Sequence, residues 1–216
     1  MINILILDYG ICNIKSIQRG LDKVGAKVTI SNDPKKIMTA DKLVLPGVGA
    51  FGTGMNNLKS TNVIEHINEY RQSGKEILGI CLGMQMLLSQ SFENGTFRGL
   101  DYISGNVSKI SSDKENGNIR KIPSIGWNSL IISNDKNELN KGILNNIKKD
   151  DYFYFVHSYM ASEMNSNNLK AYYKYDNLDI PAVIQNENTI GLQFHPEKSA
   201  NSGLKLLENF VSKDCI

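Results

Sequence analysis

The sequence predicts an α/β protein with a mainly parallel central sheet, helices on both faces of it, and antiparallel strands in the C-terminal half. In the first half of the chain, short buried apolar runs alternate with segments whose apolar residues recur at helical spacing. Such alternation, with right-handed crossovers, favours parallel strands covered on both faces. After about residue 95, Gly, Asn, Ser and Lys become frequent and the apolar stretches are short. We find no repeat or long linker, and expect a single domain over residues 1–216.

The first half contains four expected strands, at residues 2–7, 28–30, 43–45 and 77–80. The first expected helix carries Ile14, Ile17, Leu21 and Val24 on one face, with Asn13 as its cap and Gly25 as its stop. A second helical face, over residues 63–70, ends at Gly74, and a third helix is expected over residues 84–88.

The second half contains shorter expected strands, separated by polar turns. They lie at residues 131–132, 152–156, 171–173, 182–184 and 190–194, with a turn at 186–188. A closing helix is indicated by the stripe of Leu204, Leu207 and Val211. Together these segments predict antiparallel strands and hairpins beside the parallel sheet.

Composition excludes several classes of function. The 216 residues include 24 Lys and Arg against 22 Asp and Glu, which gives a net charge of only +2. The electrostatic field of the whole protein is therefore too weak to attract nucleic acid or a membrane surface. No apolar run approaches the roughly 20 residues that cross a bilayer, and the N-terminus has no signal-peptide pattern. Three widely spaced cysteines argue against a disulfide framework. We therefore expect a cytoplasmic protein in which any functional cysteine is a free thiol.

Cys81 has the setting of a nucleophile. It lies in the pentapeptide GICLG at residues 79–83, at the junction of a buried strand and a helix. A sharp turn there exposes the side chain, and the helix N-terminus favours the thiolate. The Leu82 N–H points into the same space and can hold an oxyanion. The alternative is a buried structural cysteine; Cys12 and Cys215 have no comparable setting, and we interpret Cys215 as a frayed-end residue.

A thiolate nucleophile needs a base, and His195 is the best placed of three histidines. It is followed by Pro196 and Glu197, and residues i and i+2 of an extended segment face the same side. The Glu197 carboxylate can therefore orient the imidazole, as in a nucleophile–base–carboxylate triad. His66 is expected at the surface, whereas His157 can line a site or simply end a strand.

The third feature is a glycine-rich loop, PGVGAF at residues 46–51, directly after an expected strand. It is a weak candidate for a phosphate cradle, since it lacks the dinucleotide and P-loop patterns. The alternative is that it presents a backbone N–H across the crevice from Cys81. Within this loop, Val48 either supplies such a backbone N–H or packs beneath the loop, and the residues alone leave both roles open.

These motifs, taken in combination and order, resemble those of triad-type (class I) glutamine amidotransferases. GICLGMQ at 79–85 and HPE at 195–197 carry that likeness. The likeness narrows to the glutaminase subunits of imidazole glycerol phosphate synthase through DYG, PGVGAF, GWN, FVHSY and HPEKS, at residues 8–10, 46–51, 126–128, 155–159 and 195–199. The resemblance covers essentially the whole chain and implies the class I amidotransferase (flavodoxin-like) fold.

The resemblance implies hydrolysis of L-glutamine to glutamate and ammonia without metal or cofactor. Cys81 attacks, His195 transfers the proton, and Glu197 holds the imidazole. The oxyanion lies between the Leu82 N–H and, after a local rearrangement, the Val48 N–H next to Gly49. Ammonia passes to a (β/α)₈ cyclase partner in a heterodimer, which makes imidazole glycerol phosphate and AICAR in histidine biosynthesis. The implied substrate residues are Gln85, His157, Ser158 and Tyr159, and the implied partner contacts are Ser124, Trp127, Asn128 and Lys198.

One position departs from the family pattern: Ser124 stands where these subunits usually have His. It belongs to the segment that faces the cyclase in the family, so the glutaminase chemistry is unaffected. Two alternatives remain beside the histidine pathway. One is a paralogous subunit that supplies ammonia for amidino sugars of surface polysaccharides, and the other is a non-catalytic interaction subunit, against which the intact triad argues.

Overall fold

A computed structural model describes residues 1–216 except 12, 114–118, 134–141, 213–214 and 216. The main sheet has eight strands in the spatial order β2 (Lys27–Ser31), β1 (Asn3–Leu7), β3 (Lys42–Leu45), β4 (Glu76–Ile80), β14 (Thr189–Leu192), β13 (Leu178–Asn186), β12 (Leu169–Tyr175) and β9 (Ile131–Ile132). Strands from β2 to β14 are parallel, and those from β14 to β9 are antiparallel. The parallel part has the flavodoxin-like order, which confirms the predicted fold class.

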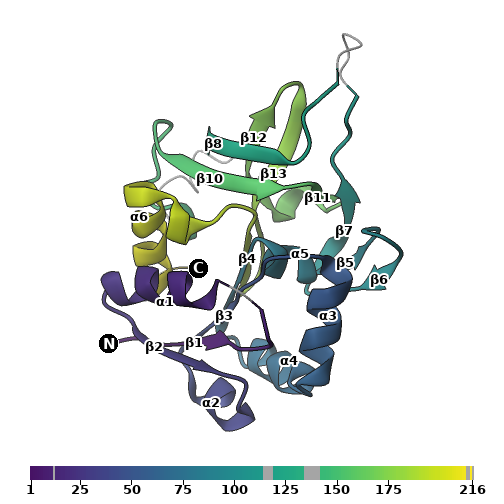
Figure 1. The fold of residues 1–216 in the computed structure, drawn as a ribbon. Helices are drawn as coiled ribbons and strands as arrows, with labels where there is room; N and C mark the ends of the chain where they lie inside the picture. The colour runs from purple at the N-terminus through teal and green to yellow at the C-terminus, as the bar shows by residue number, and fades with distance from the viewer. Residues whose placement is uncertain (12, 114–118, 134–141, 213–214, 216) are drawn as a thin grey trace.

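Helices cover both faces of this sheet (Figure 1). Residues along β1 alternate between two cores, because successive side chains of a strand point to opposite faces. Ile4 and Ile6 pack with helices α1 (Ile14–Lys23) and α6 (Ala200–Val211). Leu5 and Leu7 pack on the other face, with helices α2 (Pro34–Thr39), α3 (Phe51–Ser60), α4 (Ile64–Gln72) and α5 (Leu82–Met86).

Two smaller sheets lie beside the carboxyl ends of the parallel strands (Figure 1). One has the order β11 (Tyr159–Ser162), β7 (Ile103–Lys109), β5 (Leu88–Ser91) and β6 (Phe97–Arg98). The other pairs β10 (Tyr152–His157) with β8 (Ser124–Ser129). Three short 3₁₀ helices complete the described elements, η1 (Gly142–Leu144), η2 (Ser166–Asn168) and η3 (Pro196–Lys198).

Several boundaries differ from the sequence prediction. The helix expected over 84–88 ends at Met86, because Leu88 already pairs with Ile103 in β5. Helices α2 and α3 were not predicted, although Asp33 and Pro34 supply a start signal and Asp33 accepts a hydrogen bond from the Lys35 N–H at 2.9 Å. The buried face of α6 is Gly203, Leu206, Leu207 and Phe210, so Leu204 and Val211 are only half-buried.

Two further expectations were wrong. Asn13 precedes α1, but its side chain makes no cap hydrogen bond. Cys215 is not a frayed-end residue: it is fully buried, and burial raises the pKa of its thiol to about 12. Cys12 lies outside the described residues. Among the helices of the described ranges, none is both long and apolar enough to span a bilayer.

Candidate active site

Cys81 occupies the sharp turn between β4 and α5. Its backbone lies at φ 54° and ψ −108°, a region that costs free energy for any residue with a side chain. The neighbouring glycines allow this turn to form against β3. A Cβ atom at position 83 would lie 1.9 Å from the Leu45 carbonyl oxygen, and one at position 79 would lie 2.8 Å from the Gly83 carbonyl oxygen. The glycines of the pentapeptide are therefore required by close backbone approach.

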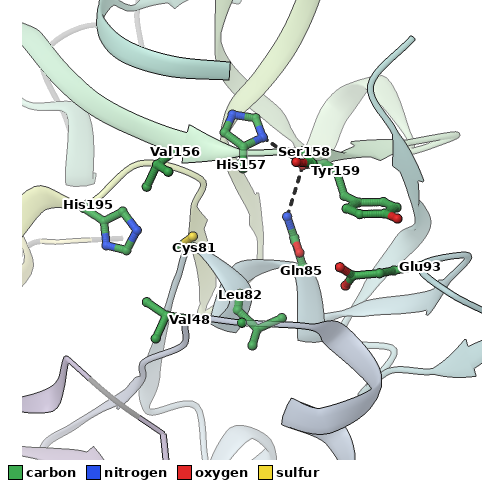
Figure 2. Close-up of a pocket in the computed structure, with 11 residues that line it drawn as sticks. Val48, Cys81, Leu82, Gln85, Glu93, Val156, His157, Ser158, Tyr159 and His195 are labelled. Carbon is green, nitrogen blue, oxygen red and sulfur yellow. Dashed lines mark hydrogen bonds between the residues drawn. The ribbon is translucent and has the colours of Figure 1, made fainter. Parts of the chain in front are cut away.

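His195 and Glu197 form a buried pair beside Cys81. The His195 Nδ1 atom lies 2.8 Å from Glu197 Oε1, and the two side chains are 2% and 0% exposed. Figure 2 shows the His195 imidazole beside the Cys81 sulfur, at one side of the pocket. Burial alone would lower the pKa of His195, but its hydrogen bonds and charge interactions with Cys81 and Glu197 outweigh burial and raise it to about 9. The arrangement therefore favours the protonated form of His195.

The glycine-rich loop packs directly against the nucleophile turn. The Leu82 N–H, the predicted oxyanion donor, donates to the Gly47 carbonyl oxygen at 3.3 Å. Beneath the loop, the buried Tyr9 hydroxyl donates to the Pro46 carbonyl oxygen, and burial raises the pKa of this phenol. Gly49 is exposed, with φ at 107°. In this conformation the Leu82 N–H is therefore bonded to the loop, and this donor is not available to an oxyanion.

A cavity of about 310 Å³ opens next to Cys81 (Figure 2). Its walls come from the loop after β3, from α5, from the segment after β5 and from β10. All the predicted triad, oxyanion and substrate residues except Glu197 line it, together with two others; the lining is Val48, Gly49, Cys81, Leu82, Gln85, Glu93, Val156, His157, Ser158, Tyr159 and His195. The tertiary structure thus brings together loops that are far apart in the sequence.

Gln85 is held in the floor of this cavity by its side-chain nitrogen. That nitrogen donates to the Tyr159 carbonyl oxygen at 3.2 Å and to the Gln193 side-chain oxygen at 3.1 Å. The fully buried Gln193 in turn places its own amide nitrogen 3.9 Å from Cys81 Sγ. Sequence reasoning did not single out Gln193, although it lies only two residues before His195.

His157 lines the cavity, but both of its ring nitrogens are bonded within the protein. Nδ1 lies 2.8 Å from the Tyr159 carbonyl oxygen, and Nε2 lies 2.9 Å from the Tyr173 hydroxyl oxygen. A carbonyl only accepts, so Nδ1 carries the proton and Nε2 accepts from Tyr173. Burial lowers the pKa of His157 to about 4. Both ring nitrogens are therefore engaged within the protein, and the substrate role expected of His157 stays a prediction.

Glu93 is a cavity residue that sequence reasoning missed. One carboxylate oxygen accepts from the Phe51 N–H at 2.7 Å, at the start of α3, and the residue is half-buried in the cavity wall. Figure 2 places this carboxylate close to Gln85, across the cavity from His195. No motif marks Glu93, because its position depends on how β5 pairs with β7. It supplies negative charge at the end of the cavity away from the nucleophile.

The predicted partner residues do not share one surface. Strand alternation separates them: Trp127 is 50% exposed, whereas Ser124 is 1% exposed and its hydroxyl lies 2.9 Å from that of Tyr173. Asn128 is half-buried, on the same face of β8 as Ser124, and Lys198 is exposed on η3. Because side chains of a strand alternate between faces, Ser124 and Asn128 lie on the opposite face of β8 from Trp127. Their contact with a partner stays a prediction.

The side chains that share a face with Trp127 follow from the register of the two strands. Ile125 pairs with Val156 and Trp127 with Tyr154, so these four side chains lie on one face of the β8–β10 sheet. We call Ile125, Trp127, Tyr152, Tyr154 and Val156 the docking face. Ile125 and Tyr152 are 57% and 52% exposed.

No group of three or more His, Cys, Asp or Glu side chains in the described ranges is placed to hold a metal ion. The site combines a strained cysteine, a buried His–Glu pair, a flanking loop with backbone donors, and an acidic residue at the far end of the cavity. These are the parts of a thiol acyl-transfer site.

The fold and this site define a glutamine amidotransferase. The family model described as glutamine amidotransferase class-I matches residues 5–213, and the chain belongs to that family. Two solved structures share the fold. A putative GMP synthase subunit from Thermoplasma acidophilum has a TM-score of 0.68 at 19% identity, covering 98% of this chain and 92% of that one. PurLQS from Thermotoga maritima has a TM-score of 0.67 at 20% identity, covering 97% of each chain.

Relatives of higher identity place the chain more narrowly within the family. It is 46% identical over 211 residues to imidazole glycerol phosphate synthase subunit HisH 1 of Legionella pneumophila strain Paris, covering 98% of this chain and 99% of the relative. It is 41% identical to subunit HisH of Lactococcus lactis, covering 99% and 100%. It is also 41% identical to subunit HisH of Archaeoglobus fulgidus, covering 97% and 98%.

Proposed function

We propose that this chain is the glutaminase subunit of an imidazole glycerol phosphate synthase and hydrolyses L-glutamine to glutamate and ammonia. The observation that carries the proposal is the strained Cys81 turn facing the buried His195–Glu197 pair at the edge of a cavity. The full-length similarity to HisH subunits supports the histidine pathway. We treat residues 1–216 as one amidotransferase domain, acting in the cytoplasm.

The reaction proceeds by acyl transfer to sulfur. The Cys81 thiolate attacks the side-chain amide carbon of glutamine, and the carbonyl oxygen becomes an oxyanion. As the carbon–nitrogen bond breaks, the leaving nitrogen takes a proton from His195, so that ammonia and a γ-glutamyl thioester form. Water then gives a proton to His195 and attacks the thioester, which releases glutamate and restores the thiolate. Glu197 orients the imidazole and stabilises its charged form.

The cavity suits the amino-acid end of glutamine. Glu93 provides a carboxylate for the α-ammonium group, and the chain at Ser158 and Tyr159 borders the same space. The Leu82 N–H stays bonded to Gly47 until the loop moves. We propose that rotation of the loop peptide frees this donor and turns the Val48 N–H next to Gly49 toward the oxyanion. Losing one oxyanion donor typically costs roughly 10²–10³ in rate, so this loop is suited to act as a switch.

The docking face provides a surface for the cyclase. It is aromatic and partly exposed, and through Val156 it is continuous with the cavity. It also lies next to the triad, because the His195 N–H donates to the Tyr154 carbonyl oxygen at 3.0 Å. A (β/α)₈ cyclase seated there, as a heterodimer, covers the cavity mouth and receives ammonia directly. Exposed Lys198 lies on η3, which contacts β10, and is a further proposed contact.

The two alternatives are disfavoured by specific observations. A non-catalytic interaction subunit has no need of a strained nucleophile beside a charged base, a combination that costs stability. An amidino-sugar paralogue would have the same triad, but the relatives are named as subunits of imidazole glycerol phosphate synthase, which favours that enzyme for this chain. The acceptor that stimulates glutaminase activity distinguishes these pathways: the histidine-pathway nucleotide on its cyclase, or an activated sugar on its amidating partner.

The test compares two cysteine variants. Cys81→Ala should abolish glutamine hydrolysis in the complex with the cyclase and leave binding to the cyclase unchanged, whereas Cys215→Ala, at a buried thiol outside the cavity, should retain hydrolysis. Treatment with the glutamine analogue diazo-oxo-norleucine, followed by peptide mass spectrometry, should place the adduct on Cys81. Hydrolysis by the Cys81→Ala protein, or an adduct on Cys215, would refute the assignment.

A further inference from the structure

Asn13, directly before α1, has a backbone conformation that is energetically unfavourable for most residues other than glycine. Its φ of 79° and ψ of 0° lie in the left-handed region, which Asn tolerates better than most residues. An Asn in this place usually caps the helix by accepting a backbone N–H, but this one does not. Its backbone carbonyl already accepts from the Ser16 N–H at 3.1 Å. The side chain of Asn13 is therefore directed elsewhere.

That side chain donates to the carboxylate of the triad. Asn13 Nδ2 lies 2.6 Å from Glu197 Oε1, the same oxygen that lies 2.8 Å from His195 Nδ1. The other oxygen of Glu197 is buried and has no hydrogen-bond partner among the described residues. Asn13 and His195 are thus the two side-chain donors to this carboxylate in the described part of the chain. Buried charge without such donors is strongly destabilised.

The packing of α1 holds Asn13 in this place. Helix α1 lies against η3, which contains Glu197, and Gly20 of α1 lies at this contact. A Cβ atom at position 20 would lie 3.7 Å from Glu197 Cβ and 2.9 Å from Leu207 Cδ1. The Asn13 amide, directly before this helix, reaches the Glu197 carboxylate of η3. A segment from the first fifteen residues thus reaches a catalytic group near the opposite end of the sequence.

We propose that Asn13 is a positioning residue of the active site: its amide fixes the Glu197 carboxylate, which in turn fixes the His195 imidazole toward Cys81. The inference rests on the proposed glutaminase function and adds a fourth member that does not touch the substrate. Two donors on one oxygen restrict rotation of the carboxylate group. With one donor lost, the carboxylate turns more freely and the imidazole is held less firmly.

The test uses Asn13→Gly, because glycine adopts the left-handed conformation without strain and lacks only the amide. The readout is inactivation by diazo-oxo-norleucine, which separates analogue binding (KI) from the chemical step (kinact). A hydrogen bond to a charged group typically contributes 1.5–3 kcal/mol, so kinact should fall roughly 10- to 100-fold while KI stays within about twofold. Loss of a donor to this buried carboxylate should lower the thermal stability of the variant, so both proteins are assayed well below the unfolding temperature of the variant.

The same substitution on a Glu197→Gln background tests whether Asn13 acts through Glu197. We expect Asn13→Gly to slow wild type strongly and the Glu197→Gln protein by less than about threefold, since the charge it would fix is absent. An unchanged kinact in Asn13→Gly alone, or equal slowing in both backgrounds, overturns the inference. Failure of diazo-oxo-norleucine to label the wild-type protein would instead contradict the proposed function.

Discussion

Acid should destabilise this protein through His157, because the folded state buries that imidazole in its neutral form. The pKa of His157 is lowered from 6.5 to about 4, with burial as the main cause. The unfolded chain takes up a proton as the pH falls through 6.5, whereas the folded protein does so only near pH 4. The stability contributed by neutral His157 is therefore fully present above pH 6.5 and is lost as the pH falls toward 4.

The size of this loss follows from the two pKa values. At about pH 4.5 the loss of unfolding free energy reaches about 2.5 kcal/mol, a large share of the total for a domain of this size. Other shifted groups act in different pH ranges. The raised pKa of His195 stabilises the folded state below pH 6.5, and that contribution is lost only as the pH rises through about 9. The lowered pKa values of Asp41 and Asp151 affect stability at about pH 4 and below.

Urea unfolding of wild type and His157→Gln at several pH values between about 7 and 4.5 measures the effect. The variant should be less stable at pH 7, because the Tyr159 carbonyl and Tyr173 hydroxyl lose their imidazole partner. Its stability should then fall by about 2.5 kcal/mol less than wild type over this range. His66→Gln, at a half-buried histidine of α4, is the matched control for replacing a histidine. Parallel pH curves for wild type and His157→Gln would refute the reasoning.

Three further predictions concern the fold and the docking face. Gly83→Ala places a methyl group against the Leu45 carbonyl and should lower the free energy of unfolding by more than about 4 kcal/mol or prevent folding. Gly25→Ala, which has open space around it and a φ of 83°, should lower that free energy by only about 1–2 kcal/mol in chemical unfolding. Equal losses in the two variants would contradict the close-approach argument. Trp127→Ala should weaken cyclase binding at least tenfold, measured by titration calorimetry, with little change in thermal stability. Unchanged affinity would contradict the proposed contact between Trp127 and the cyclase. The Cys215 thiol should react with a colorimetric thiol reagent only after unfolding, since burial raises its pKa to about 12; rapid reaction in the native protein would contradict its burial.

Much of the site could be predicted because its parts are local in the sequence. The Cys81 turn is specified by the glycines beside it, and the His195–Glu197 pair needs only one intervening residue. The buried faces of the closing helix and of β8 were predicted less well, since they depend on neighbours that the pattern does not identify. Trp127 and Asn128 are adjacent in sequence but lie on opposite faces of β8. Cys215 looks like a chain end in the sequence, yet the structure buries it completely.

The sequence by itself determined the fold class and marked Cys81, His195 and Glu197 as a candidate triad, because apolar periodicity and short motifs are properties of neighbouring residues. Only the tertiary structure decided what surrounds them. Parallel pairing of β4 with β3 and β14 brings the glycine-rich loop, Cys81 and His195 to one edge of the sheet. The positions of Glu93 and Asn13 depend on contacts between segments far apart in the chain. Such contacts follow from packing as a whole and leave no local pattern to read.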